Sequence, residues 1–322
     1  MEMKSTFIAV AGVLACLAVG SAMAQSYPDN PIRLIVPAAA GGSTDLGARV
    51  IGDLLGNELG VPVVVENKGG GGGRIGAAFV ASAKPDGYTL LYGNSITNAL
   101  LPAASRNLHY DAAKDFAPVA QVFWYPTIIA CNANLPYNDL AGLIKYGKEH
   151  DGEPVVATAG VGSGNHFSAA LLGSMAGINQ LFVPYKGNSP AVQDVIAGRA
   201  DCIHMTEVKP YIDAGQLKAI ASTGKRRDPR FPDLPTVSES GLKGYDATWR
   251  QAIFAPAGTP QAVIDKLAAA IKQAVQSPTL PNKMEGSGFV PEYEGPKELA
   301  EVMAQDTEKF REIAQQAHLE LE

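Results

Sequence analysis

One sequence unit, a short apolar strand that runs through a small-residue turn into a helix, most constrains how this chain can fold. The segment Arg33–Val36 is apolar and is stopped by Pro37, which predicts a buried strand. Apolar residues at helical spacing then predict a helix from Asp45 to Leu59. The first N–H groups of such a helix have no partner within it, so with the helix dipole they form a site for an anion. The candidate contacts are Ala40, Gly41, Ser43, Thr44 and Asp45.

The same unit recurs in the second half of the chain. A predicted strand at Val155–Ala159 is followed by the glycine turn Gly160–Gly164 and by another helix. Each turn then lies at the carboxyl end of its strand, where α/β sheets bind ligands. Two such turns facing each other fit a ligand with two separated carboxylates, which would draw the two halves together. The candidate contacts in the second turn are Gly162, Ser163, Asn165 and His166.

A bare carboxylate side chain is an unusual neighbour for a bound anion. We therefore expect Asp45 to cap its own helix, to hold the turn, or to reach the ligand through water. A capped helix with no ligand remains the alternative interpretation for either turn taken alone.

Short apolar runs alternate with amphipathic helical segments from Tyr27 onward, which predicts an α/β fold with largely parallel sheets. Two extended stretches interrupt this alternation. The run Asp115–Asn132 is broken by Pro126, and Thr248–Ala255 also has the pattern of an extended segment. We predict that both are hinge strands between two α/β blocks.

The first residues have the pattern of a signal peptide. Lys4 supplies a positive charge, Phe7–Val19 is apolar, and Ala22-Met23-Ala24 is a small-residue cleavage site. We expect cleavage after Ala24 and a periplasmic protein. Cys16 is a poor match to a lipoprotein acylation site, and acylation is the disfavoured alternative.

Two cysteines, Cys131 and Cys202, remain after that cleavage. Export permits a disulfide, but both lie in apolar runs, and we expect two buried thiols rather than a bridge. The net charge of −6 argues against nucleic acid or an anionic membrane surface as a partner.

Other polar residues follow predicted strands and are further candidates for the cleft. Asn94 and Ser95 end one strand, and Glu207, which could accept a hydrogen bond from a ligand hydroxyl or amine, follows another. Alternation sends neighbouring side chains of a hinge strand to opposite faces, so one of Trp249 and Arg250 is expected to face the cleft. An inward arginine would bind a carboxylate bidentately. Lys186 and Asn188 precede a helix predicted to start at Pro190 with Ser189 as its N-cap.

Enzyme interpretations find little support in the residues. The spacing Gly71-x-Gly73-x-x-Gly76 matches a dinucleotide fingerprint, but it does not follow the first strand of its unit. Ser163 lacks the surrounding pattern of a nucleophile elbow. The five histidines form no ligand cluster, so we expect no metal and no cofactor.

The chain also resembles the periplasmic solute-binding receptors of tripartite tricarboxylate transporters, often called the Bug family. The resemblance covers nearly all of the chain after the signal peptide. It is carried by YPDNPIRLIVPAAAGGSTD (Tyr27–Asp45), VVVENKGGGGGRIGA (Val63–Ala77), PDGYTLLYG (Pro85–Gly93), DFAPVA (Asp115–Ala120), GVGSGNHF (Gly160–Phe167), VPYKGNSPAVQDVIAGRAD (Val183–Asp201), LPTVSESGLKGY (Leu234–Tyr245) and APAGTP (Ala255–Pro260).

This resemblance implies a two-lobed periplasmic binding protein, type II-like, with a Rossmann-like sheet in each lobe and two hinge crossovers. We expect residues 1–24 as signal peptide, 25–126 and 250–322 as lobe 1, and 127–249 as lobe 2. The family grips carboxylates with the turns that correspond to Ala38–Asp45 and Gly160–His166. This chain departs from the family pattern at Ala40 and Gly69, where proline is usual. Neither departure removes a hydrogen-bond donor.

The residues predict a non-enzymatic protein that binds a small organic carboxylate, and we expect a monomer. The resemblance implies that it delivers this ligand to the permease subunits of a tripartite tricarboxylate transporter. Dicarboxylates, tricarboxylates, amino-acid carboxylates and aromatic acids all remain open as ligands. A sensor subunit for a signalling partner and an exported enzyme are the alternatives.

Overall fold

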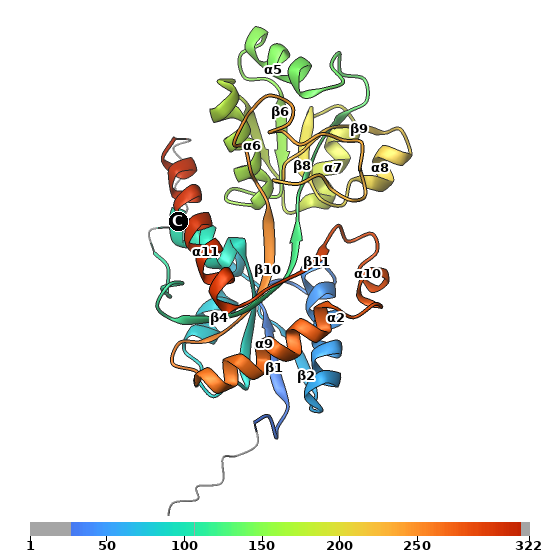
Figure 1. Cartoon of the computed structure of the whole chain (residues 1–322). Coiled ribbons are helices and arrows are strands. Elements are labelled where there is room, and N and C mark those ends of the chain that lie inside the picture. Colours follow the sequence, from blue (N-terminus) through green and yellow to red (C-terminus); the bar gives the residue numbers. More distant parts are fainter. Residues whose placement is uncertain (1–26, 106, 317–322) are drawn as a thin grey trace, which may run out of the picture.

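The computed structural model describes residues 27–105 and 107–316, which form two lobes, each built on its own twisted sheet. Figure 1 shows one lobe below and one above, joined by extended segments of chain. The predicted signal peptide lies outside the described residues.

The lower lobe is built on a six-stranded sheet with the order β11-β4-β10-β3-β1-β2. β1 pairs in parallel with β2 and β3, while β10 runs antiparallel to β3 and β4. The strands are β1 (Ile32–Val36), β2 (Val63–Asn67), β3 (Thr89–Asn94), β4 (Phe116–Tyr125), β10 (Trp249–Pro256) and β11 (Val290–Glu294).

The helices of this lobe bury an apolar core against the sheet, in which the side chains of Leu34, Ile51 and Leu55 have no exposed surface. The helical elements are α2 (Ser43–Leu59), η1 (Gly71–Gly73), α3 (Arg74–Ala81), the π-helical η2 (Ile96–Leu100), α4 (Leu101–Ala104), α9 (Gln261–Val275), α10 (Leu280–Lys283) and α11 (Pro296–Gln316).

The upper lobe is built on a five-stranded sheet with the order β7-β6-β8-β5-β9. Its strands are β5 (Ile128–Asn132), β6 (Val155–Thr158), β7 (Leu181–Pro184), β8 (Cys202–Met205) and β9 (Leu217–Ser222). Its helices are α5 (Leu140–Glu149), α6 (Gly164–Ala176), α7 (Asn188–Ile196) and α8 (Lys209–Asp213).

The chain changes sheets between β4 and β5, and again between β9 and β10. These are the two stretches whose extended pattern predicted hinge strands. We propose the division 25–126 and 250–322 for lobe 1 and 127–249 for lobe 2, because it agrees with where the strands change sheets.

Helix α11 makes a further connection between the lobes. It covers β4, η2 and α4 of lobe 1, and it also lies against α6 of lobe 2. Figure 1 shows it rising from the lower lobe along one side of the crossover strands. A single buried apolar cluster therefore contains residues of both lobes.

The expectation of two free thiols is wrong, because Cys131 and Cys202 form a disulfide. They lie directly opposite each other on the antiparallel neighbours β5 and β8, with Cα atoms 4.0 Å apart. That distance depends on which strands pair, and the sequence pattern alone did not specify the pairing.

Several element boundaries also differ from the predictions. Helix α2 begins at Ser43, two residues before the predicted start, with Gly42 as its N-cap. Helix α7 begins at Asn188 with Gly187 as its N-cap, so the prediction of Ser189 as N-cap is wrong. Glycine residues fill both cap positions, and the polar residues after them lie in the first helical turn.

Candidate functional site

A cavity of about 490 Å³ lies between the two lobes. Residues from both contribute to it, and both glycine turns open onto it. Its lining is Ala38, Ala39, Gly41, Gly42, Ser43, Thr44, Ile96, Tyr125, Thr127, Ala159, Ser163, Gly164, Asn165, Asn188, Ser189, His204, Met205, Thr206, Glu207, Trp249 and Phe289.

The first turn is held in shape by Asp45. Its Oδ2 accepts hydrogen bonds from the Gly41 N–H at 2.9 Å and from Arg49 Nε at 3.0 Å, while its Oδ1 accepts from Asn67 at 2.9 Å. Burial raises the pKa of Asp45, but the hydrogen bonds from Arg49, Gly41 and Asn67 outweigh burial and leave the pKa below its ordinary value. Of the three roles expected for Asp45, the structure shows the one that holds the turn.

The second turn is braced by Asn165. Its Oδ1 accepts from the Ala159 N–H at 3.1 Å, and its Nδ2 donates to Asn188 Oδ1 at 3.0 Å, which ties the start of α6 to the start of α7. The Ser163 hydroxyl lies 2.6 Å from the Gly160 carbonyl oxygen and 2.5 Å from Asn165 Oδ1. Its proton therefore stabilises the turn, and the Ser163 N–H also donates internally, to the Gly160 carbonyl oxygen at 3.2 Å. The donors of this segment are therefore the backbone N–H groups at the start of α6.

Three helices begin at this cavity: α2 of lobe 1, and α6 and α7 of lobe 2. None has a side-chain cap hydrogen bond at its N-terminus. The first N–H groups of a helix have no intrahelical acceptor, and each helix dipole places partial positive charge at that end. The arrangement can therefore bind negative charge with neutral donors.

The lobes are joined at the cavity by a hydrogen bond from the Ser43 hydroxyl to Oε1 of Glu207, with a distance of 2.6 Å. Glu207 follows β8, so this contact links the start of α2 to the end of a lobe 2 strand. Among the described residues that line the cavity, Glu207 is the sole acidic side chain, and neither lysine nor arginine occurs.

His204 lies on β8 and is 1% exposed. Its Nδ1 is 2.7 Å from the Ser168 hydroxyl, which in turn lies 3.1 Å from the Tyr245 hydroxyl. Burial lowers the pKa of His204 from 6.5 to about 3, so the ring is neutral near pH 7. Its Nε2 is buried and has no hydrogen-bond partner among the described residues.

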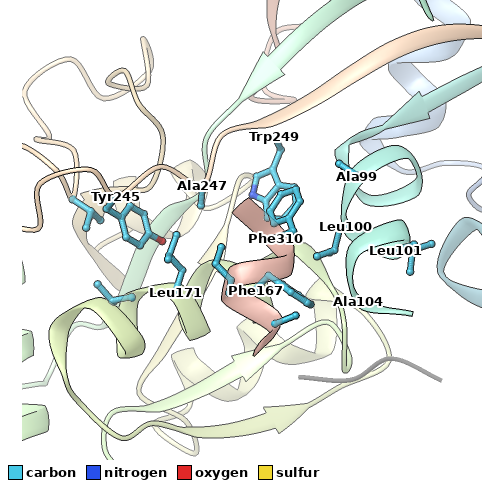
Figure 2. Close-up of a cluster of buried hydrophobic side chains, with 14 of the residues drawn as sticks. Ala99, Leu100, Leu101, Ala104, Phe167, Leu171, Tyr245, Ala247, Trp249 and Phe310 are labelled. Carbon is cyan, nitrogen blue, oxygen red and sulfur yellow. The ribbon is translucent and has the colours of Figure 1, made fainter. Parts of the chain in front are cut away.

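Trp249 lines the cavity, whereas Arg250 does not. Figure 2 shows the Trp249 indole lying over the Phe310 ring of α11; the two rings stack 5.5 Å apart at an angle of 13°. The Trp249 Nε1 is buried without a hydrogen-bond partner among the described residues. Arg250 instead donates to Asp306 of α11 at 2.7 Å. Of the two neighbours, one of which was predicted to face the cleft, Trp249 lies in the cavity lining and Arg250 is paired with Asp306.

Half of the candidate contacts therefore meet around the cavity. Those that line it are Gly41, Ser43, Thr44, Ser163, Asn165, Asn188, Glu207 and Trp249.

Other candidates lie outside the lining, each for a physical reason. Asn94 Oδ1 accepts from the N–H groups of Ile96 and Thr97 and so holds the local turn, whereas Ser95 Oγ accepts from the Arg250 N–H of β10. Ala40 and Lys186 have exposed side chains.

The two remaining candidates of the second turn also lie outside the lining. The Gly162 N–H donates to His166 Nδ1 at 3.1 Å, and the buried His166 ring packs against Phe182. Burial lowers the pKa of His166, which keeps the ring neutral. The sequence predicts both as direct ligand contacts, whereas in the structure each has an internal partner.

Sequence reasoning missed part of the lining, including His204 as a cavity residue. His204 and Thr206 lie at the carboxyl end of β8, and Ile96 follows β3, so strand ends were the available signal. Phe289 precedes β11, a strand that the sequence pattern did not predict. Gly71–Gly73, which begin the spacing that matches a dinucleotide fingerprint, form η1 and lie outside the cavity lining.

Within residues 27–105 and 107–316, no group of acidic, histidine or cysteine side chains is arranged to hold a metal ion. The same part of the chain contains no helix of the length and apolarity that crossing a bilayer requires.

Comparison with known proteins gives a family. The family described as "Tripartite tricarboxylate transporter family receptor" (TctC) matches residues 47–319. A UPF0065 protein from the TAR-I ttuE-ttuC' intergenic region of Agrobacterium vitis is 37% identical over 292 residues, which is 90% of this chain and 84% of the relative. BugT of Bordetella pertussis is 33% identical over 322 residues, which is 98% of this chain and 96% of BugT.

Solved structures agree with this fold. The periplasmic binding protein BugD superposes with a TM-score of 0.77 at 34% identity, covering 91% of this chain and 99% of BugD. R. palustris Rpa4515 with adipate superposes with a TM-score of 0.80 at 30% identity, covering 91% of this chain and 99% of Rpa4515. MatC from Rhodopseudomonas palustris with bound malate superposes with a TM-score of 0.76 at 32% identity, covering 89% of this chain and 99% of MatC.

The predicted two-lobed α/β fold is confirmed by these superpositions. The family consists of receptors, which also confirms the prediction of a binding protein rather than an enzyme. The chain belongs to the tripartite tricarboxylate transporter receptor (TctC) family.

Proposed function

We propose that this protein is a periplasmic receptor that captures a small organic carboxylate between its lobes and delivers it to the permease subunits of a tripartite tricarboxylate transporter. One observation carries the proposal: three helix N-termini without side-chain caps, from both lobes, open onto one cavity.

The chemistry of these donors favours a carboxylate. Backbone N–H groups and helix dipoles stabilise negative charge without a cationic side chain, and the described lining contains neither lysine nor arginine. The cavity volume of about 490 Å³ lies within the usual range for sites that bind small molecules. Two relatives of similar fold were solved with adipate and with malate, which are both dicarboxylates.

Binding then follows from the geometry. One carboxylate of the ligand accepts hydrogen bonds at the start of α2, at Ser43 and Thr44. The other end accepts them at the starts of α6 and α7, from the segments around Asn165 and Asn188. Ordered waters bridge the ligand to backbone donors that lie too far from it for a direct hydrogen bond. Because the two ends contact different lobes, binding stabilises the closed arrangement.

Export and partnership complete the proposal. We infer that the signal peptide is removed after Ala24 and that the mature receptor acts in the periplasm. Delivery to a membrane permease is supported by membership of the transporter receptor family. In this role the closed, ligand-bound form is the one that the permease recognises.

The binding proposal can be tested with the purified mature protein. A thermal-shift screen against a panel of mono-, di- and tricarboxylates should raise the melting temperature for a subset of ligands, since a ligand stabilises the state it binds. Isothermal titration then gives affinity and stoichiometry, with one ligand per chain expected. Neutral amides of the same carbon skeletons are the control, and stabilisation by these to the same extent would contradict a carboxylate site.

Delivery needs a separate experiment. Proteoliposomes that contain the permease subunits should accumulate the labelled carboxylate when the receptor is added, and not without it. Ligand binding without receptor-dependent uptake would favour the sensor alternative. Conversion of the ligand to a product, followed by chromatography, would contradict the receptor function.

A further inference from the structure

Glu207 has an environment that a pure anion site does not explain. Its Oε1 accepts the 2.6 Å hydrogen bond from Ser43, but its Oε2 is buried and has no partner among the described residues. A buried carboxylate oxygen that lacks a donor destabilises a protein, so such an oxygen points to a group that supplies the donor.

No cationic side chain of the described cavity lining compensates the negative charge of Glu207. That lining contains neither lysine nor arginine. Tyr125 also lines the cavity, and its pKa is raised first by burial and then by the charge of Glu207. The helix N-termini therefore form an anion-binding part of the cavity, and Glu207 forms an acceptor part.

Two other buried polar atoms belong to the same lining. His204 is 1% exposed and Trp249 is 2% exposed, and within the part of the chain that the structure describes neither the His204 Nε2 nor the Trp249 Nε1 has a hydrogen-bond partner. The indole N–H is a fixed donor, which suits a carboxylate oxygen. With Glu207, these atoms indicate a ligand that carries both acceptors and at least one donor.

We propose that Glu207 makes the cavity selective for carboxylates that carry a hydroxyl or ammonium group over plain carboxylates of the same chain length. This inference depends on the proposed carboxylate-binding function and specifies its ligand class. A ligand O–H or N–H donates to Glu207 while the carboxylates of the ligand accept from the helix N-termini.

The selectivity depends on the direction of the hydrogen bond, because Glu207 can only accept one and the ligand must donate it. A hydroxyl or ammonium group supplies a charge-assisted hydrogen bond to the Glu207 carboxylate. A plain dicarboxylate leaves that oxygen without a donor and brings a second negative charge close to it. Sites that hydrogen-bond a substituent discriminate strongly against analogues that lack it.

Matched ligands test this directly by isothermal titration. The panel contains succinate, malate and aspartate, then glutarate, 2-hydroxyglutarate and glutamate, and adipate with its 2-hydroxy and 2-amino derivatives. We expect the preferred chain length to show at least about tenfold tighter binding for the hydroxy or amino member than for the plain diacid. The hydroxy and amino arms tell which donor the site takes.

Glu207→Gln is the decisive variant because it keeps the shape of the side chain. The amide oxygen still accepts from Ser43, but the amide N–H₂ then replaces Oε2 and donates where the carboxylate accepted. The preference should fall to about threefold or less, through weaker binding of the donor ligand and tighter binding of the plain diacid.

Two further variants separate this effect from a general loss of structure. Ser43→Ala removes the contact between the lobes but retains the carboxylate, so all affinities fall while the preference persists. Asp213→Asn removes an exposed carboxylate on α8 that pairs with Lys209 and should leave every affinity unchanged. Urea unfolding of each variant shows whether it is folded.

Each result decides a different point. Tightest binding of a plain diacid by the wild type, or a preference that survives Glu207→Gln, overturns the selectivity while leaving the carboxylate receptor intact. Binding of no carboxylate in the whole panel contradicts the proposed function itself. A donor preference that disappears in Glu207→Gln and persists in Ser43→Ala supports the inference.

Discussion

The Trp249 indole, at the start of β10, stacks on the Phe310 ring of α11 with 5.5 Å between ring centroids, and it also forms part of the cavity wall. Figure 2 shows both rings beside Phe167 and Leu171 of α6, with Leu100 of η2 on the other side. This cluster joins the C-terminal helix, a crossover strand and lobe 2 in one packed unit, so it links the cavity to the connection between the lobes.

The first prediction concerns the two tryptophans of the chain, Trp124 and Trp249. Trp249 lines the cavity, whereas Trp124 lies outside the lining and stacks under Arg226. Ligand binding should therefore change the emission of Trp249 alone. Trp124→Phe retains the ligand-induced fluorescence change and Trp249→Phe loses it.

Trp249→Phe should also weaken binding of the best ligand by about tenfold, because the ring stacking remains but the indole N–H is lost. Titration calorimetry measures this change, with Trp124→Phe as the matched control. An unchanged affinity in Trp249→Phe would show that the indole N–H has no role in binding.

The second prediction concerns Phe310, which is 2% exposed and packs against Trp249 and Phe167. Phe310→Ala should lower the free energy of unfolding by about 3 kcal/mol, the range typical for removing a buried aromatic ring. Urea denaturation measures it. Leu181→Ala is the control, since Leu181 is 56% exposed and its truncation should cost less than about 0.5 kcal/mol. Equal effects of the two variants would contradict the packing described here.

The third prediction concerns the disulfide between Cys131 and Cys202, which closes a loop across a sequence separation of 71. Replacing both cysteines with alanine should lower the free energy of unfolding by about 2–4 kcal/mol, because the cross-link restricts the unfolded chain. A phosphine reductant should lower the melting temperature of the wild type and leave that of the double variant unchanged. Two thiols that react in the unfolded, unreduced wild type would contradict the bridge.

The fourth prediction is a pH dependence from His204. Burial lowers its pKa from 6.5 to about 3, so between these values the unfolded chain binds a proton that the folded chain does not. Stability that is present above pH 6.5 is therefore lost as the pH falls, by about 2 kcal/mol from this group between pH 7 and pH 5.

Urea unfolding of the ligand-free protein at both pH values tests this, with His204→Gln as the comparison. The glutamine does not titrate, and contributions from carboxyl groups and from His166 are common to both proteins. The wild type should lose about 2 kcal/mol more than the variant on acidification. An equal loss in the two proteins would mean that His204 is protonated in the folded state.

The sequence allowed much of the fold to be predicted, because the relevant signals are local. The apolar run that forms β1, the small residues before α2 and the glycine turn before α6 each specify their own conformation. The hinge positions followed from proline and from extended runs. What local patterns did not specify was pairing, and both the disulfide and the edge strand β11 depend on it.

For the site as well, features that depend on local sequence could be predicted, and features that depend on distant segments could not. Backbone donors at Ser43, Thr44 and Asn165 could be placed from the sequence, since the start of a helix determines where its N–H groups point. Side-chain roles could not. Arg250 pairs with Asp306 of α11, and no local pattern predicted that this helix would lie beside β10. His204 is neutral because it is buried, and its contacts with Ser168 and, through it, Tyr245 come from distant segments that no local pattern connects.

The position of α11 has a consequence for how the receptor moves. This helix lies along one side of the crossover strands and contacts both lobes, while α2 lies on the other side (Figure 1). A motion that keeps Phe310 of α11 in contact with Phe167 of α6 pivots at that contact. The two lobes then separate on the side away from α11. The hydrogen bond between Ser43 and Glu207, which joins the lobes at the cavity, is among the contacts that such an opening breaks.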